Sequence, residues 1–272
     1  MHNFLKVSGG IASTLVSISF MFIPESLFAK YNIFSNISNE MNIIVNRIVF
    51  LLGVIVISMI LSAIYICIRK KITIKGHNYT IQIEYGDIQK TKKCKRVINF
   101  DECFTTTVGD SPSDIKPTSI CGQYLLKKPD IDINTLIANA RLKPAKTNSK
   151  FQNKVRYDSG KLVPNGDDLL MAFAKLDENG IGRFFSYQEF LDCLSILWEE
   201  IDKYYGQKDV CIPILGSGLT RINGQSLTQQ ELLDIIIMSY KLNTHKIKKP
   251  YKLRIICKKN DGFSLNNIGE SL

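Results

Sequence analysis

Val210-Cys-Ile-Pro-Ile-Leu215 is a continuous apolar run that leads directly into Gly216-Ser-Gly-Leu-Thr-Arg221. A short apolar run that ends in a glycine-rich turn is typical of a buried strand in an α/β domain. The turn can direct several backbone N–H groups at one point, which suits a diphosphate. The candidate contacts are Gly216, Ser217, Gly218, Leu219, Thr220 and Arg221. Taken alone, the stretch fits a simple tight turn equally well. It is neither a Walker loop nor a dinucleotide fingerprint, because Gly-Lys-Ser/Thr and the third glycine are missing.

Other strand-like runs lie on both sides of this stretch. They are Ile81 to Tyr85, Lys95 to Phe100, Leu169 to Leu176 and Leu253 to Cys257. Two helices start with capping boxes, in which Ser186 precedes Glu189 and Thr228 precedes Glu231 by three positions. Alternating strands and helices predict an α/β domain with a mixed, partly parallel sheet over residues 72–272. Within it, residues 127–154 carry many lysines around one short helical piece and are predicted to be a basic insertion or loop.

Two more strands end in polar residues. Asp87 and Ile88 follow the alternating run Ile81 to Tyr85, at the place where ligands of open α/β sheets usually bind. The competing interpretation is a turn in which Asp87 caps the residues that follow. The next strand leads into a polar stretch whose candidate ligand-binding residues are Asn99, Asp101, Glu102, Thr105 and Thr106. A solvated loop with a helix cap is the alternative there.

The first 71 residues differ sharply from the rest. Ile48 to Ile68 is uncharged over 21 positions, and at about 1.5 Å per residue it reaches roughly one bilayer core. Val7 to Ile23 is a shorter uncharged run, for which a cleaved signal peptide is the alternative to a second span. Residues 1–71 are therefore predicted to form a two-span transmembrane hairpin. Because the flanking cations favour the outer ends, both termini are predicted to be cytoplasmic, in the inner membrane.

Charge and cysteine usage agree with this arrangement. The chain has a net charge of +10, of which residues 1–71 contribute +4, so residues 72–272 contribute +6. That excess fits anionic lipid headgroups or a phosphorylated ligand, and no nucleic-acid-binding motif accompanies it. The cysteines of the domain are scattered singly, without a CxxC pair. We therefore predict no disulfide framework, no metal site and no nucleic-acid partner.

In this order, the three polar strand ends resemble the macro domains. The stretches Asn99-Phe-Asp-Glu-Cys-Phe-Thr105, Ser119-Ile-Cys-Gly122 and Ile212 to Arg221 are similar to the divergent macro domain of Thoeris antiphage effectors. With two preceding spans, the layout resembles the type II Thoeris effectors. The resemblance covers residues 72–272 and implies a macro-like three-layer fold. The glycine-rich first loop of ordinary macro domains is absent, which argues against removal of ADP-ribose from proteins.

The resemblance also implies a function. A partner TIR-domain enzyme would convert NAD into histidine-conjugated ADP-ribose, which the macro domain would bind without catalysis or a further cofactor. Asp87 and Ile88 would take the adenine, with Phe263 stacking on it, the loop from Asn99 to Thr107 the distal ribose, and Gly216 to Arg221 the diphosphate. Asp101 or Glu102 would pair with the amino group of the conjugated amino acid.

Binding would then drive homo-oligomerisation, membrane disruption and abortive infection. The small residues Gly9, Ser13 and Ser17, spaced four apart, would let helices approach closely in lipid. Two alternatives remain open from the sequence. One is a membrane-anchored ADP-ribosyl hydrolase or phosphoesterase with Asp101 or Glu102 as base. The other is a structural membrane anchor that holds another macromolecule.

Overall fold

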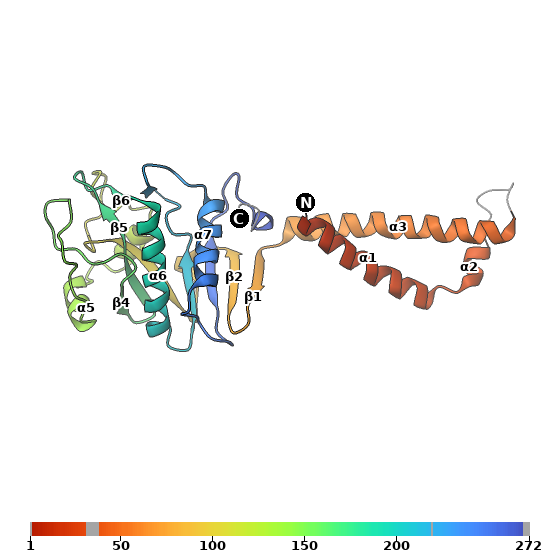
Figure 1. Ribbon diagram of the computed structural model, residues 1–272, viewed down its shortest axis with the longest axis horizontal. Helices are drawn as coiled ribbons and strands as arrows, with labels where there is room; N and C mark the ends of the chain where they lie inside the picture. Colours follow the sequence, from red (N-terminus) through yellow and green to blue (C-terminus); the bar gives the residue numbers. More distant parts are fainter. Residues whose placement is uncertain (1, 31–37, 219, 269–272) are drawn as a thin grey trace. The chain divides into compact units, whose positions relative to one another are not determined.

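The computed structural model describes residues 2–30, 38–218 and 220–268. The chain divides into two compact units, Met1–Arg69 and Lys70–Leu272. The first unit holds helices α1 (His2–Phe22), α2 (Glu25–Ala29) and α3 (Asn39–Ile68). The second unit holds all the strands of the described chain and the remaining helices (Figure 1).

Helix α3 is, among the described residues, the one helix long and apolar enough to cross a membrane. It begins where the Ser38 hydroxyl accepts a hydrogen bond from the backbone N–H of Met41, which is a standard N-cap. Its 30 residues include the whole run that was predicted to be the second span. Helix α1 covers most of the predicted first span but does not pass the same test. Its role as a membrane span, and with it the two-span topology, stays a prediction.

The buried residues of α3 include polar side chains at intervals of four or multiples of four, namely Asn42, Asn46, Ser58 and Ser62. Within this unit, α3 contacts both α1 and α2. The Asn46 amide nitrogen donates to the backbone carbonyl of Phe28 over 2.7 Å. The Ser62 hydroxyl donates to the carbonyl of Ser58 over 2.6 Å. The polar groups are thus turned inward, while large apolar side chains cover the exposed surface of the helix.

The sheet of the second unit has nine strands in the described residues, in the order β1-β2-β9-β7-β3-β5-β6-β8, with β4 paired to β5. Strands β2, β9, β7, β3 and β5 run parallel, whereas β1, β4 and β6 pair antiparallel with their neighbours. The mixed sheet is therefore confirmed. The strands are β1 (Lys71–Lys75), β2 (Thr80–Tyr85), β3 (Cys94–Asp101), β4 (Leu162–Asn165), β5 (Asp168–Leu176), β6 (Gly182–Phe184), β7 (Asp209–Pro213), β8 (Arg221–Ile222) and β9 (Leu253–Cys257).

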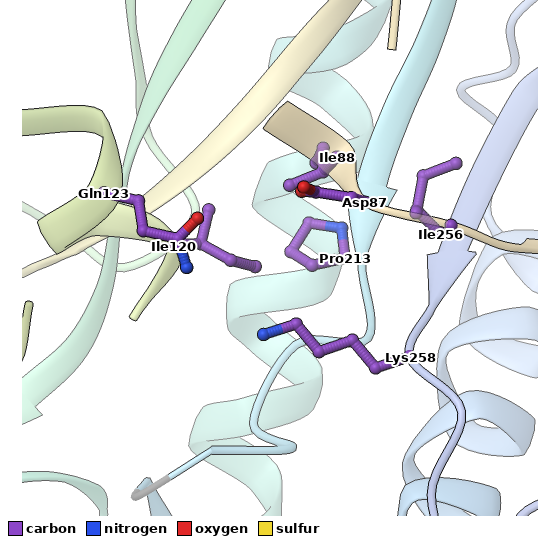
Figure 2. Close-up of a pocket in the computed structure, with 8 residues that line it drawn as sticks. Asp87, Ile88, Ile120, Gln123, Pro213, Ile256 and Lys258 are labelled. Carbon is purple, nitrogen blue, oxygen red and sulfur yellow. The ribbon is translucent and has the colours of Figure 1, made fainter. Parts of the chain in front are cut away.

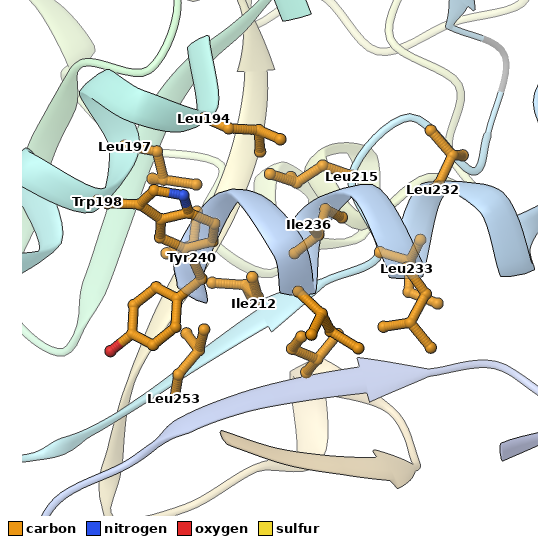
Figure 3. Close-up of a cluster of buried hydrophobic side chains, with 14 of the residues drawn as sticks. Leu194, Leu197, Trp198, Ile212, Leu215, Leu232, Leu233, Ile236, Tyr240 and Leu253 are labelled. Carbon is orange, nitrogen blue, oxygen red and sulfur yellow. The ribbon is translucent and has the colours of Figure 1, made fainter. Parts of the chain in front are cut away.

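Alternation along the central strands sends apolar side chains to both faces of the sheet. On β5, Met171 belongs to the cluster under α6 (Tyr187–Tyr204) and α7 (Gln229–Leu242), whereas its neighbour Leu170 belongs to the cluster under α4 (Ile120–Lys127) and α5 (Ile133–Asn139). Figure 3 shows part of the first cluster, in which Trp198 of α6 and Tyr240 of α7 pack edge to face with ring centroids 5.0 Å apart. Helices on both faces make three layers.

Both predicted capping sites begin helices. Thr228 and Glu231 form the full reciprocal capping box of α7. At α6 the Ser186 hydroxyl accepts from the N–H of Glu189, but the Glu189 carboxylate binds Lys175 and the N–H of Phe185 instead. The predicted basic insertion, residues 127–154, contains α5 and otherwise has no helix or strand between Lys128 and Lys154.

Candidate ligand-binding site

Two adjoining cavities lie where parallel strands β2, β9, β7 and β3 end. The larger has a volume of about 610 Å³, within the usual range for small-molecule sites. The smaller has a volume of about 200 Å³ (Figure 2). Four residues line both of them, namely Ile120, Pro213, Ile256 and Lys258. Because parallel strands end at one edge of a sheet, the loops after these strands meet here.

Asp87 and Ile88 line the smaller cavity directly after β2. One carboxylate oxygen of Asp87 accepts from the N–H of Gln89 over 2.9 Å and caps the short helix η1 (Ile88–Lys90). Capping uses one oxygen, so a ligand contact through the other is compatible with it. Ile88 is buried in a small cluster with Ile256 and two cysteines, Cys94 and Cys211, which stand behind the cavity wall.

The glycine-rich turn after β7 lines the larger cavity through Gly216, Ser217, Gly218 and Thr220. Gly216 has φ +84, a conformation that L side chains rarely adopt. Across the described residues, the backbone N–H groups of Gly216 and Gly218 donate no hydrogen bond, whereas that of Ser217 reaches the carbonyl of Ile214 at 3.4 Å. Two N–H groups are thus available at the cavity, as an anion nest requires.

The rest of this motif is placed differently. Arg221 does not line either cavity, because it begins β8, which pairs with β6. Leu219 lies outside the described residues. Of the five described residues of the predicted diphosphate loop, four therefore line the cavity.

At the end of β3, Asn99 and Asp101 line the larger cavity. The side-chain oxygen of Asn99 is buried and, within the described chain, has no hydrogen-bond partner. One carboxylate oxygen of Asp101 accepts from the N–H groups of Cys103 at 2.8 Å and Thr105 at 3.1 Å. Burial raises the pKa of Asp101. This end of the cavity therefore offers acceptors to a ligand that brings hydrogen-bond donors.

Besides Arg221, four predicted contact residues line neither cavity, namely Glu102, Thr105, Thr106 and Phe263. Thr105 and Thr106 do not line them, although the Thr105 amide holds Asp101. Glu102 is 2 % exposed and is used inside the domain. Its carboxylate accepts from the Ser149 hydroxyl and the Leu176 N–H and pairs with Arg156 at 3.4 Å.

Phe263, the last of these four residues, is part of the hydrophobic core. It belongs to the main core cluster, and its ring packs edge to face on Tyr85 with centroids 5.9 Å apart. Phe263 lines neither cavity, and its role in stacking on the adenine stays a prediction.

Several lining residues were not predicted. Lys258 follows β9 and lines both cavities, and the rule that ligands bind beyond strand ends would have found it. Residues 112–116 and the segment 180–182, which leads into β6, add further walls where sequence patterns give no signal. In the described chain, no group of three or more His, Cys, Asp and Glu residues could hold a metal ion.

The family model described as "Thoeris protein ThsA, Macro domain" matches residues 81–258. A curated relative, the Thoeris protein ThsA of Bacillus amyloliquefaciens (strain Y2), is 29% identical over 228 residues, which cover 80% of this chain and 76% of the relative.

Solved structures give weaker matches. The Oceanobacillus iheyensis macrodomain with ADP has a TM-score of 0.44 and 11% identity, and the match covers 70% of this chain and 89% of that one. The same macrodomain with MES bound has a TM-score of 0.39 and 10% identity, with the same two coverages.

Proposed function

The chain belongs to the family of ThsA macro domains of Thoeris proteins, and from that premise we propose that it is an antiphage effector that binds an NAD-derived ADP-ribose signal. The observation that supports this most directly is the pair of adjoining cavities. Asp87 stands in one and the Gly216 to Gly218 turn in the other, and both share the wall made by Pro213 and Ile256. An elongated nucleotide could extend through both.

The lining residues suggest how such a ligand would lie. The adenine would occupy the smaller cavity, with its exocyclic amine donating to the free oxygen of Asp87. The diphosphate would accept from the unpaired N–H groups of Gly216 and Gly218. The distal ribose and its substituent would reach the acceptors of Asn99 and Asp101. A histidine conjugate brings extra donors to this end, so we propose histidine-conjugated ADP-ribose as the signal.

We propose binding without turnover. Of the two carboxylates that could act as a base, Glu102 is committed to Ser149, Leu176 and Arg156 inside the domain. Asp101 is held by two amides of its own loop. Incubation of the protein with histidine-conjugated ADP-ribose, followed by chromatography of the nucleotide, separates a receptor from a hydrolase. A product that accumulates with time would establish the hydrolase.

In this proposal the first unit places the protein in the membrane. We propose that α3 crosses the inner membrane, that both termini are cytoplasmic, and that a TIR-domain enzyme supplies the signal. Ligand binding would then shift the population toward oligomers that disrupt the membrane and arrest growth. Gly9, Ser13 and Ser17 lie exposed on α1 and are available to another copy. Crosslinking in native membranes tests this step, and an unchanged oligomer distribution after addition of ligand would refute it.

The binding claim is tested by calorimetry on the full-length chain purified in detergent. The ligands are ADP-ribose, its histidine conjugate, NAD and cyclic ADP-ribose. We expect saturable binding of the first two, with the conjugate tighter because it fills the Asn99 and Asp101 end. An Asp87→Ala variant should lose affinity, whereas Asp130→Ala, an exposed aspartate that lines neither cavity, should not. Failure of all four ligands to bind the native protein would remove the proposal.

A further inference from the structure

The wall between the two cavities contains one charged residue. Of the four residues that line both cavities, Ile120, Pro213 and Ile256 are apolar, and the fourth is Lys258. In Figure 2 the Lys258 side chain extends from the end of β9 past Pro213, with Asp87 on the other side of that proline. The junction that an elongated ligand must pass is therefore apolar except for one ammonium group.

The backbone of Lys258 is held in place from two sides. Cys257, the residue before it, is fully buried as the last residue of β9. The Lys258 carbonyl accepts a hydrogen bond of 2.9 Å from the side chain of Gln229, the first residue of α7. The starting point of the side chain is thus fixed by the sheet and by a helix, while the side chain itself remains exposed.

The ammonium group has no partner among the described residues, neither a hydrogen bond nor an ion pair. The other lysines of the larger cavity differ in this respect. Lys116 donates to the carbonyls of Asp110 and Ser111, and Lys259 lies over the ring of Tyr85. Asp87 lines the same small cavity, yet no ion pair joins it to Lys258. Lys258 is therefore a cation available to a ligand.

We propose that Lys258 is a specificity-determining residue that pairs with the diphosphate of a ligand extending through both cavities. This inference rests on the proposed function and adds a charge requirement to it. The backbone N–H groups of the glycine turn can hold an anion through partial charges alone. Lys258 adds a full charge at the junction, so the site favours a nucleoside diphosphate conjugate over a neutral nucleoside of similar shape.

The size of the effect follows from the exposure of the lysine. Hydrogen bonds to charged groups are stronger than those between neutral groups, and solvent weakens such pairs at exposed positions. We therefore expect about a tenfold loss of affinity for a diphosphate ligand when the charge is removed. The affinity for a neutral nucleoside should not change when this charge is removed.

The experiment compares Lys258→Met, Lys258→Arg and Lys92→Met in the full-length chain in detergent, by calorimetry with ADP-ribose and with adenosine. Lys92 is an exposed lysine before β3, lines neither cavity and provides the same change of charge. We expect Lys258→Met to bind ADP-ribose about tenfold more weakly, with a shallower dependence on salt. Lys258→Arg should retain affinity because it keeps the charge, and Lys92→Met should match the native protein.

The outcomes separate this inference from the function on which it rests. If the native protein binds ADP-ribose and both methionine variants bind it equally well, Lys258 has no such role, and the proposed function stands. Equal losses for ADP-ribose and adenosine in Lys258→Met would show an effect of shape rather than charge and would also overturn the inference. If the native protein does not bind ADP-ribose, this inference fails, whereas the proposed function fails only if the histidine conjugate, NAD and cyclic ADP-ribose do not bind either. An unchanged melting temperature of Lys258→Met confirms that folding is intact.

Discussion

The backbone of Gly216 matters both for the fold and for the candidate site. Its φ of +84 lies in the region that glycine adopts freely, and a Cβ there would approach Leu232 of α7 to 3.3 Å. Its N–H is also one of the two unpaired donors of the turn. A side chain at this position would therefore disturb both the packing of α7 and the direction of the donors.

Replacing Gly216 with alanine should separate these effects when it is compared with Gly166→Ala. Gly166 also has a positive φ, of +63, but a Cβ there would meet nothing within 4 Å and it lines neither cavity. We expect each variant to lose about 1 kcal/mol of unfolding free energy from the strained backbone. Only Gly216→Ala should lower affinity for ADP-ribose, by tenfold or more. Equal affinities in the two variants would show that the turn does not bind the ligand.

Asp101 gives a prediction for pH, because burial raises its pKa. A pKa that is higher in the folded state means that the folded state binds the proton more tightly. The resulting stabilisation is complete below the unfolded pKa of about 3.9 and is lost as pH rises through the folded value. Asp101→Asn does not titrate and keeps an oxygen for the amides of Cys103 and Thr105.

The melting temperature of the native protein, relative to that of Asp101→Asn, should therefore fall as the pH is raised from about 4 to about 7. Thermal unfolding followed by circular dichroism measures this difference. Asp130→Asn, at an exposed position, controls for the loss of one charge. Parallel pH profiles for the native protein and Asp101→Asn would contradict the expectation.

The start of α7 connects a helix to the cavity. Thr228 and Glu231 form the capping box. Gln229, which follows Thr228, lines the larger cavity, and its side chain donates a hydrogen bond to the carbonyl of Lys258. The start of α6, capped by Ser186, has no such connection. The cap of α6 can therefore serve as a control for the cap of α7, because both are hydroxyl N-caps and, of these two helices, only α7 reaches the cavity.

We expect Thr228→Ala and Ser186→Ala each to lower the free energy of unfolding by about 1 kcal/mol, because each leaves a helix N–H without its cap. Thr228→Ala should in addition weaken ADP-ribose binding by about threefold, since a frayed α7 releases Gln229. Denaturant unfolding and calorimetry on the same preparations measure both quantities. A similar binding loss in Ser186→Ala would mean that general loosening, rather than the position of Gln229, is responsible.

The elements that could be predicted are those with a strong pattern. Strand β9 coincides with the predicted run from Leu253 to Cys257. Five mostly apolar residues bounded by polar ones are typical of a buried strand and fit few other structures. Strands β6 and β8 are three and two residues long, too short to show a period. The pairing of β3 with β5 shifts register between Phe100 and Asp101, so alternation alone could not tell whether Asp101 or Glu102 faces the cavity.

At the level of the whole molecule, the membrane role of the first unit rests on α3. Leu52 is 57 % exposed near the middle of this helix, and Leu242, at the end of α7 in the other unit, is 78 % exposed. An arginine at the centre of a membrane helix costs about 2.5–3.5 kcal/mol of insertion free energy. We expect Leu52→Arg to move the protein out of the carbonate-resistant membrane fraction, and Leu242→Arg to leave it there. Retention of both variants would argue against α3 as a span.

Strand β9 comes last among the strands of the described residues, yet it lies between β2 and β7 in the sheet. A polypeptide that stops before Leu253 leaves two parallel strands with open edges and lacks the wall residues Ile256 and Lys258. During synthesis, the nascent chain therefore has no complete pocket until nearly all of the domain has left the ribosome. A product that terminates before Leu253 would lack this part of both cavity walls, so we expect it not to bind the proposed ligand.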